Sequence, residues 1–178
     1  VFAKKVLEIS GKSSLKEVWP NLELFMHGGV NFEPYKEQFK KLIPDESMNY
    51  VESYNASEGF FGIQDLPDSD ELLLMLDYGI FFEFIPMSNY KGVNSDEIYS
   101  IEDVELNKNY AVVISTNGGL WRYLIGDTIR FTSKIPYRFK VTGRTKSFIN
   151  IAGEELIVEN AENAIAEACK RTSALVKE

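Results

Sequence analysis

The sequence contains one cysteine, one histidine, and fewer basic than acidic residues. Because Cys169 is alone, the chain can form neither an internal disulfide nor a zinc site built from cysteines. The 27 acidic residues outnumber 19 lysines and arginines, which gives a net charge of −8. A general nucleic-acid surface needs clustered lysine and arginine, so we expect no nucleic-acid partner, whereas a nucleotide needs only a few local donors.

Long apolar runs are also missing. No segment approaches the roughly 18 apolar residues that a membrane-spanning helix requires, so no membrane partner is expected. The lack of a visible secretory signal and the single cysteine favour a reducing cytoplasm. The remaining balance, 44% hydrophobic and 26% charged residues over 178 positions, is that of a globular protein with one domain or slightly more.

The first quarter of the chain predicts an α/β unit. Apolar residues at helical spacing indicate a helix over residues 2–9, and the apolar run 22–26 predicts a buried strand. Gly28-Gly29 ends that strand. A second helix then begins near Pro34 and ends before Pro44.

Beyond Met48 the pattern changes to short runs typical of strands. Asp77-Tyr78-Gly79 predicts a hairpin between strands 72–76 and 80–85. Asn117-Gly118-Gly119 predicts another, between 111–116 and 120–130. A final helix is predicted over 158–176, and the other predicted strands are 48–54, 60–64, 137–142 and 147–151.

The predicted domain boundary falls at Gly143-Arg144-Thr145-Lys146. Before it we expect an antiparallel, barrel-like sheet. After it come a new strand and a helix with too few residues for a core of their own. Both ends of the chain fall within helix-like patterns, so we interpret the chain as an internal fragment.

Two segments that follow predicted strands have the composition of ligand-binding loops. In His27-Gly28-Gly29, paired glycines let the backbone approach a flat ring, although a tight turn is an equally simple interpretation. His27 is interpreted as a packing or loop residue. In Tyr54-Asn55-Ala56-Ser57-Glu58-Gly59, the Ser57 hydroxyl suits a phosphate oxygen and the Glu58 carboxylate suits Mg²⁺; the alternative is a polar turn.

Two further segments lie later in the chain. Asp127 follows Gly126 at the end of an apolar strand, where a lone aspartate can accept both hydroxyls of a ribose. In Gly143-Arg144-Thr145-Lys146 the arginine offers a forked donor to ribose or phosphate, and Lys146 lies in the linker itself. The alternatives are a turn aspartate and a charged turn between domains.

The order and spacing of the four segments make them specific together. Gly-Gly, then Y-x-x-S-E-G, Y-x-x-G-D and G-R-x-K, resembles the adenylate-forming superfamily of acyl ligases and luciferases. F-F-E-F-I-P at 81–86 and G-L-W-R-Y-L-I-G-D at 119–127 resemble the Gretchen Hagen family of acyl-acid amido synthetases. Plant members of that family join acyl acids such as auxin or jasmonate to amino acids. The resemblance extends from Trp19 to Ala168.

This resemblance implies a fold and a reaction. The fold class is α/β (α+β mixed), a fragment of the adenylate-forming fold. Residues 1–143 would form the C-terminal part of the large adenylate-binding domain, and 144–178 the hinge and the beginning of the small C-terminal domain. In the reaction, an acid and ATP give an acyl-adenylate and pyrophosphate, and an amine or amino acid then displaces AMP. Because the family's phosphate loop and most of its lid fall outside the chain, the fragment alone is expected to be inactive.

The resemblance also implies residue roles around the nucleotide and its Mg²⁺. Gly28 and Gly29 would line the adenine, while Tyr54 and Asn55 would border the base.

The remaining roles concern the phosphate, the ribose and the hinge. Ser57 would meet the phosphate and Glu58 would hold Mg²⁺. Asp127 would bind the ribose hydroxyls with Arg144 assisting, and Lys146 would be the hinge about which the small domain rotates between the two half-reactions.

Two departures from the plant pattern point to a divergent, bacterial-type branch. The plant Y-R-x-G-D reads Tyr123-Leu124-Ile125-Gly126-Asp127, so one arginine is missing. The plant S-I-D-x-D-K segment aligns with 150–155, which places Glu155 at the lysine position.

Three functional interpretations stay open on the sequence. They are an amido synthetase, an acyl-CoA ligase of the same superfamily, and a non-catalytic β-rich binding or interaction module. A binding module gives no reason for Glu58 and Asp127 to face one nucleotide-sized cleft, so their common orientation is the discriminating expectation. The acid, the amine and the oligomeric state are left open.

Overall fold

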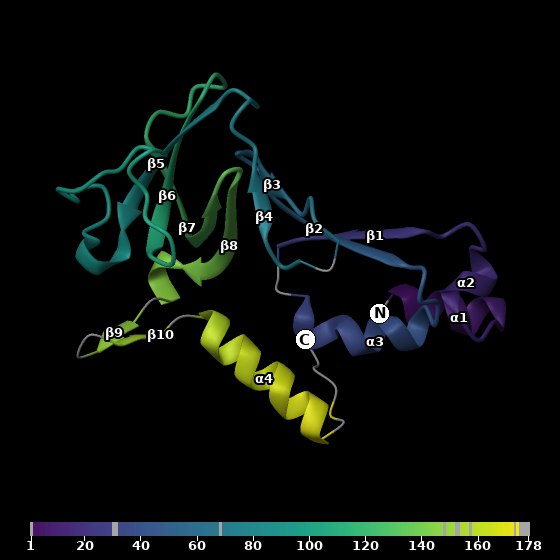
Figure 1. Cartoon of the computed structure of the whole chain (residues 1–178). Helices are drawn as coiled ribbons and strands as arrows, with labels where there is room; N and C mark the ends of the chain where they lie inside the picture. Colours follow the sequence, from purple (N-terminus) through teal and green to yellow (C-terminus); the bar gives the residue numbers. More distant parts are fainter. Residues whose placement is uncertain are drawn as a thin grey trace. The chain divides into compact units, whose positions relative to one another are not determined.

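The computed structural model describes residues 2–29, 32–67, 69–147, 149–151, 154–156, 158–172 and 174. Its helices are α1 (Phe2–Ser10), α2 (Leu15–Val18), α3 (Lys36–Leu42) and α4 (Val158–Thr172), with short 3-10 turns η1 (Glu33–Tyr35), η2 (Met87–Asn89) and η3 (Thr145–Ser147) (Figure 1). Its strands are β1 (Leu24–His27), β2 (Asn49–Ala56), β3 (Gly59–Ile63), β4 (Leu72–Leu74), β5 (Ile80–Pro86), β6 (Asn109–Thr116), β7 (Tyr123–Lys134), β8 (Tyr137–Arg144), β9 (Ile149–Ile151) and β10 (Glu154–Leu156).

The strands form one large and one small sheet. The large sheet has the order β1-β2-β3-β4-β8-β7-β6-β5, and its pairs from β2 to β5 are antiparallel. Strands β9 and β10 pair separately as a two-stranded antiparallel sheet. The chain divides into two compact units, Val1–Val51 with Glu162–Glu178, and Glu52–Ala161.

The first unit has a small apolar core. Leu15, Ile43 and Met48 are its buried side chains, and half-buried side chains from α1, β1 and β2 pack against them. Ser14 caps α2 by accepting a hydrogen bond from the Glu17 backbone N–H at 3.3 Å. The strand and helix expected here form as β1 and α3, but the strand is not buried as predicted, since Leu24 and Met26 are 47% and 53% exposed.

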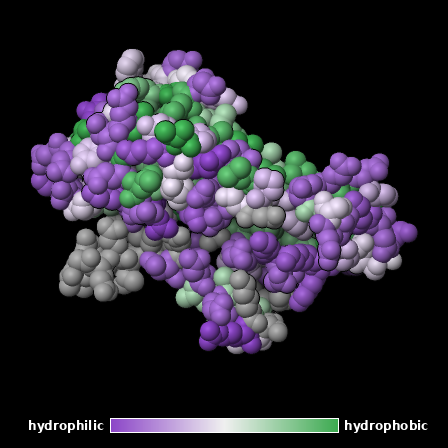
Figure 2. Space-filling view, viewed as in Figure 1, coloured by the Kyte–Doolittle hydropathy of each residue, from purple (hydrophilic) through white to green (hydrophobic). Residues whose placement is uncertain are grey.

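The second unit has an aromatic core on one face of its sheet. Side chains alternate across each strand, so Phe82 and Phe84 of β5 point inward while Phe81 is 63% exposed. The inward rings meet others from neighbouring strands; Phe84 and Phe131, for example, have ring centres 5.0 Å apart. Figure 2 shows hydrophobic side chains reaching the surface of this strand-rich unit among hydrophilic ones.

The segment that follows β5 covers the other face and the free edge of that strand. Met87 and half-buried Tyr90 pack on Ala111 and Val113 of β6. Tyr99 exchanges both backbone hydrogen bonds with Phe84, at 2.8 and 2.9 Å. Pairing of this kind protects an edge that would otherwise offer unpaired backbone groups to other chains.

The predicted hairpin around Asp77-Tyr78-Gly79 is wrong. Strand β4 pairs with β3 and β8, and β5 pairs with β6, so the two strands flanking this turn are not partners. Distant contacts favour the observed pairing: Leu72 and Leu73 pair with Phe139 and Arg138 of β8, and Arg138 makes a forked ion pair with Asp65, in the segment between β3 and β4, at 2.6 and 2.9 Å. The hairpin around Asn117-Gly118-Gly119 is confirmed by the pairing of β6 with β7.

The C-terminal region follows the prediction in part. Helix α4 ends at Thr172, whereas Val176, the expected end, lies outside the described residues. Strand β10 was not predicted. Ala152 and Gly153 of the aligned plant-like segment are outside the described residues, as is Phe148 of the predicted strand 147–151. Among the described residues, no helix combines the length and apolar character that crossing a membrane requires.

Candidate functional site

A buried carboxylate lies at the centre of the candidate site. Asp127, on β7, has a side chain that is 10% exposed. Its Oδ2 accepts a hydrogen bond from the Tyr54 hydroxyl at 2.7 Å, and its Oδ1 lies 2.9 Å from Nε of Arg144. Arg144 is the direct partner of Asp127 across β7 and β8. Two predicted site residues from distant motifs are thus bonded to the same carboxylate.

An irregularity in β7 sets the position of Asp127. Gly126 has a φ of +91°, a conformation that side chains rarely adopt. The register of β7 shifts against β6 between Leu124 and Thr128, and against β8 between Thr128 and Ile129. The Thr145 hydroxyl donates to the Gly126 carbonyl at 3.3 Å. Behind the bulge, the buried Thr142 and Thr128 hydroxyls are hydrogen-bonded at 2.9 Å. The backbone beside Asp127 is therefore fixed from two sides.

Tyr54, which was predicted to border the base, is buried in the aromatic core of the second unit. The residue is 8% exposed, and its ring centre lies 5.0 Å from that of Phe61 and 5.9 Å from that of Phe139. Burial raises the pKa of the Tyr54 hydroxyl well above its ordinary value, and the Asp127 carboxylate raises it further. The hydroxyl therefore stays protonated and donates a hydrogen bond to Asp127. A contact between Tyr54 and the base stays a prediction.

Ser57 and Glu58 form the tight turn between β2 and β3, next to Tyr54. The flanking residues Ala56 and Gly59 are paired across the two strands. Ser57 is exposed and Glu58 is half-buried. The Glu58 charge also contributes to raising the pKa of Tyr54, so Glu58 and Asp127 act electrostatically on one hydroxyl. A common cleft for Glu58 and Asp127 stays a prediction.

The structure says less about the other residues that were predicted to contact the base. Asn55 is exposed, and its Oδ1 accepts a hydrogen bond from the Ser53 hydroxyl at 3.3 Å. Gly28 and Gly29 belong to the first unit, where they follow β1. Gly29 has a φ of +82°, so a side chain at this position would be strained. The roles of Gly28, Gly29 and Asn55 toward a base stay predictions.

His27 is a packing residue, as predicted. Its ring stacks on Phe32 with centres 4.2 Å apart and on Phe25 at 6.1 Å. Burial lowers the pKa of His27 below its ordinary value of 6.5, because charging the imidazole there costs hydration.

We expect the single histidine signal in a proton NMR titration to report a pKa below 6.5 in the folded chain. Since the unfolded chain then binds the proton first, the free energy of unfolding should decrease as the pH falls through 6.5 toward the lower folded pKa. The variant His27→Gln should lose this part of the pH dependence in thermal melts between pH 7.5 and 5.5. A titration midpoint at or above 6.5 would contradict the burial.

Arg122 of the G-L-W-R-Y-L-I-G-D motif bonds to residues of two neighbouring strands. Its φ is +46°, its backbone N–H donates to the Ser115 hydroxyl at 3.0 Å, and its Nε pairs with Glu83 at 3.0 Å. These bonds join the start of β7 to β6 and β5. The arginine therefore fixes the strand that carries Asp127.

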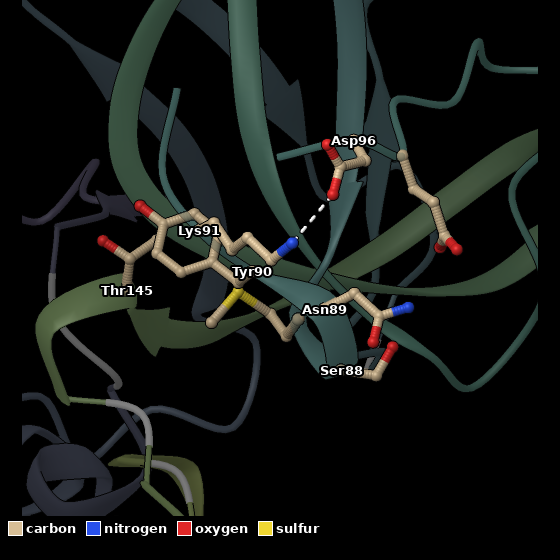
Figure 3. Close-up of a pocket in the computed structure, with 8 residues that line it drawn as sticks. Ser88, Asn89, Tyr90, Lys91, Asp96 and Thr145 are labelled. Carbon is tan, nitrogen blue, oxygen red and sulfur yellow. Dashed lines mark hydrogen bonds and ion pairs between the residues drawn. The ribbon is translucent and has the colours of Figure 1, made fainter. Parts of the chain in front are cut away.

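Sequence reasoning missed a polar pocket of about 680 Å³ beside η3 (Figure 3). Thr145 is the one motif residue in its lining, and the Lys91 ammonium pairs with Asp96 at 2.7 Å within it. Asp127 is not among the lining residues. The rest of the lining comes from η2 and the loop after it, which match no motif, so only tertiary structure brings them to Thr145. The full lining is Met87, Ser88, Asn89, Tyr90, Lys91, Asp96, Glu97 and Thr145.

Comparison with known proteins places the chain in a family. The GH3 family central domain matches residues 73–144 and the GH3 family N-terminal domain matches residues 2–48. The indole-3-acetic acid-amido synthetase GH3.4 of Arabidopsis thaliana is 30% identical over 172 residues, which cover 86% of this chain and 28% of the relative. The 4-substituted benzoates-glutamate ligase GH3.12 of Arabidopsis thaliana is 27% identical over 169 residues, covering 89% of this chain and 28% of the relative. The chain thus spans less than a third of these proteins.

Solved structures share the fold. GH3.15 acyl acid amido synthetase matches with a TM-score of 0.66 and 20% identity, over 95% of this chain and 31% of that one. Coronafacic acid ligase from Pectobacterium brasiliense matches with a TM-score of 0.51 and 15% identity, over 93% of this chain and 32% of that one. The expected fold class, a mixed α/β fragment of the adenylate-forming fold, is confirmed. With its two domain models matching more than half of the residues, the chain belongs to the GH3 (Gretchen Hagen) family.

Proposed function

We propose that this chain is the nucleotide-binding part of an ATP-dependent acyl-acid amido synthetase. The whole enzyme activates a carboxylic acid as an acyl-adenylate and transfers the acyl group to an amine or amino acid. The observation that carries this proposal is the buried Asp127 carboxylate, bonded to Tyr54 and Arg144. A relative named as an indole-3-acetic acid-amido synthetase and another named as a 4-substituted benzoates-glutamate ligase support the reaction.

Asp127 is suited to the ribose of ATP. A carboxylate has about four lone-pair sites, and the Tyr54 hydroxyl and Arg144 each use one. Arg144 is 69% exposed, so it can turn from Oδ1 toward the ribose or a phosphate without disturbing the core. The freed oxygen then accepts the ribose hydroxyls.

Ser57 and Glu58 fit the phosphates and a Mg²⁺ ion. Among the described residues no three histidine, cysteine or acidic side chains are grouped as a complete metal cage. A single half-buried carboxylate agrees with the way Mg²⁺ is held by one or two carboxylates together with substrate phosphates. When bound, Mg²⁺ offsets charge on the phosphates during attack by the acid. In this proposal Glu58 would make this contact from the short turn between β2 and β3.

The hinge and the location complete the proposal. Lys146 would be the hinge between residues 1–143, part of the large domain, and 144–178, the beginning of the small one. In support, β8 ends at Arg144, η3 follows, and β9 and β10 form a sheet of their own. Gly28, Gly29 and Asn55 would contact the base. The single Cys169 supports a reducing cytoplasm.

A two-stage assay on the full-length enzyme tests the proposal. We expect acid-dependent exchange of labelled pyrophosphate into ATP, followed by amide formation when an amino acid is added. A reaction without acid is the control. Thioester formation with CoA instead of amide would identify an acyl-CoA ligase, and ATP binding without exchange would favour a binding module. The 178-residue chain alone should give only background, because positioning by the rest of the enzyme supplies much of the rate.

A further inference from the structure

We infer that the polar pocket beside η3 is a binding site for a free α-amino acid, separate from the proposed nucleotide site. The inference goes beyond the proposed function, because it concerns a second ligand site and not the reaction itself. The pocket volume of about 680 Å³ lies within the range of small-molecule sites. All the lining residues belong to the second unit, so the pocket forms within one compact part of the chain.

The pocket offers separate partners for the two charges of an amino acid. The Lys91 ammonium donates a hydrogen bond to Oδ2 of Asp96 at 2.7 Å (Figure 3). A lysine ammonium has three N–H donors, so two are left for a ligand carboxylate. The exposed Glu97 carboxylate lines the same pocket and offers acceptors for an α-ammonium. With one cationic and two anionic side chains, the pocket suits a ligand that carries both charges better than a simple anion.

The loop that carries these charges is closed by a buried serine. Ser95 is 8% exposed. Its hydroxyl accepts a hydrogen bond from the Lys91 backbone N–H and donates one to the Gly92 carbonyl, both at 2.8 Å. The loop is thus already ordered without a ligand, so little conformational freedom has to be lost on binding.

The floor of the pocket is less polar and lies across the sheet from Asp127. Met87 is 4% exposed and packs with half-buried Tyr90 on the outer residues of β6. The thioether and the ring suit the apolar part of an amino acid, and an aromatic face attracts an ammonium. Asp127 bonds to Tyr54 in the aromatic core, on the other face of the sheet. A ligand in the pocket therefore leaves the nucleotide residues free.

The pocket also borders the proposed hinge. Thr145 of η3 is half-buried in its lining, and its hydroxyl donates to the Gly126 carbonyl at 3.3 Å. Lys146 is the next residue along η3. An amino acid bound here would contact the segment of the hinge and not the reacting acyl group. This consequence rests on the proposed function, whereas the binding itself does not.

The experiment follows the Met87 methyl group by NMR in the full-length enzyme with methyl-labelled methionine. Met87→Leu, a change that nearly conserves volume, assigns the signal. Glycine, L-leucine and L-glutamine are added without ATP or acid, and we expect the Met87 signal to shift. Isoamylamine and 4-methylpentanoate each lack one charge of leucine. They should bind about fivefold more weakly, the effect of losing one exposed charge pair.

Charge variants test the two ends of the ligand. Lys91→Gln and Glu97→Gln replace exposed side chains, so both variants should fold. Each should weaken leucine binding by about fivefold, and the double variant by about 25-fold. Lys108→Gln is the matched control, because Lys108 also forms an exposed ion pair at 2.7 Å, with Glu105, but lies outside the pocket. It should leave leucine binding unchanged.

The outcomes separate this inference from the proposed function. An unshifted Met87 signal with all three amino acids would overturn the inference, as would equal responses of wild type and the double variant. Isoamylamine binding as tightly as leucine would also overturn it, because the site would then recognise a simple amine. A Met87 response in an enzyme without pyrophosphate exchange would support the pocket while the proposed function fails. Pyrophosphate exchange without a Met87 response would overturn this inference alone.

Discussion

Asp127→Ala in the full-length enzyme should weaken ATP binding by about one to two decades. The variant removes the charged acceptor of the ribose hydroxyls, and such hydrogen bonds contribute roughly 1.5–3 kcal/mol. It also leaves the buried Tyr54 hydroxyl without its acceptor. Isothermal calorimetry with ATP measures the effect directly.

Asp65→Ala is the matched control for Asp127→Ala. Asp65 also forms an ion pair with an arginine of β8, Arg138, but lies outside the candidate site. Its loss should lower the stability of the sheet and leave ATP affinity unchanged. Equal ATP binding by wild type and Asp127→Ala would exclude the ribose role, and equal weakening by Asp65→Ala would show that the effect is structural.

Lys146→Pro should separate the two half-reactions of the full-length enzyme. Lys146 lies in the middle of η3, where 3-10 geometry places φ close to the −65° that proline imposes. The variant is therefore compatible with the conformation seen here, and it resists a rotation of this residue to another conformation. Pyrophosphate formation should persist in part, while amide formation should fall by roughly a hundredfold if the second state is disfavoured by about 3 kcal/mol.

The control for the hinge is Lys146→Ala, which removes the exposed side chain and keeps the backbone free. We expect it to retain both half-reactions, timed separately by pyrophosphate release and by product mass. If Lys146→Ala loses amide formation as fully as the proline variant, the side chain and not the backbone is responsible. If proline slows both half-reactions equally, or neither, Lys146 is not the hinge.

Local patterns in the sequence predicted where the strands lie better than which strands pair with each other. The Asn117-Gly118-Gly119 hairpin was predictable because its strands are consecutive and pair with each other along β6 and β7. The turn at Asp77-Tyr78-Gly79 has an equally local signal, and Gly79 does adopt a φ of +73°. Its strands nevertheless separate, because β8, more than sixty residues away, pairs with β4 and forms ion pairs with Asp65 and Asp70 in the segment before it.

In the candidate site, too, local motifs were predictable and contacts between distant residues were not. Spacing of motifs identified Asp127, Glu58 and Arg144 as a group. The structure bonds Asp127 to Arg144 and to Tyr54, and the place of Glu58 beside them stays a prediction. The bond from the Tyr54 hydroxyl to Asp127 could not be derived, since it depends on how Phe61 and Phe139 orient the ring. The pocket beside η3 could not be predicted from the sequence either, because the loop residues that line it match no motif.

The bond from the Thr145 hydroxyl to the Gly126 carbonyl connects the proposed hinge to the residue before the ribose-binding carboxylate. If η3 is the hinge, a rotation that breaks this bond would alter the part of β7 on which Asp127 lies, and lid position and nucleotide affinity would be thermodynamically linked. Linkage is reciprocal. If one lid position binds ATP more tightly than AMP by some factor relative to the other position, replacing AMP by ATP shifts the lid equilibrium toward that position by the same factor. Conversion of ATP to AMP would then itself drive the lid from the first half-reaction to the second.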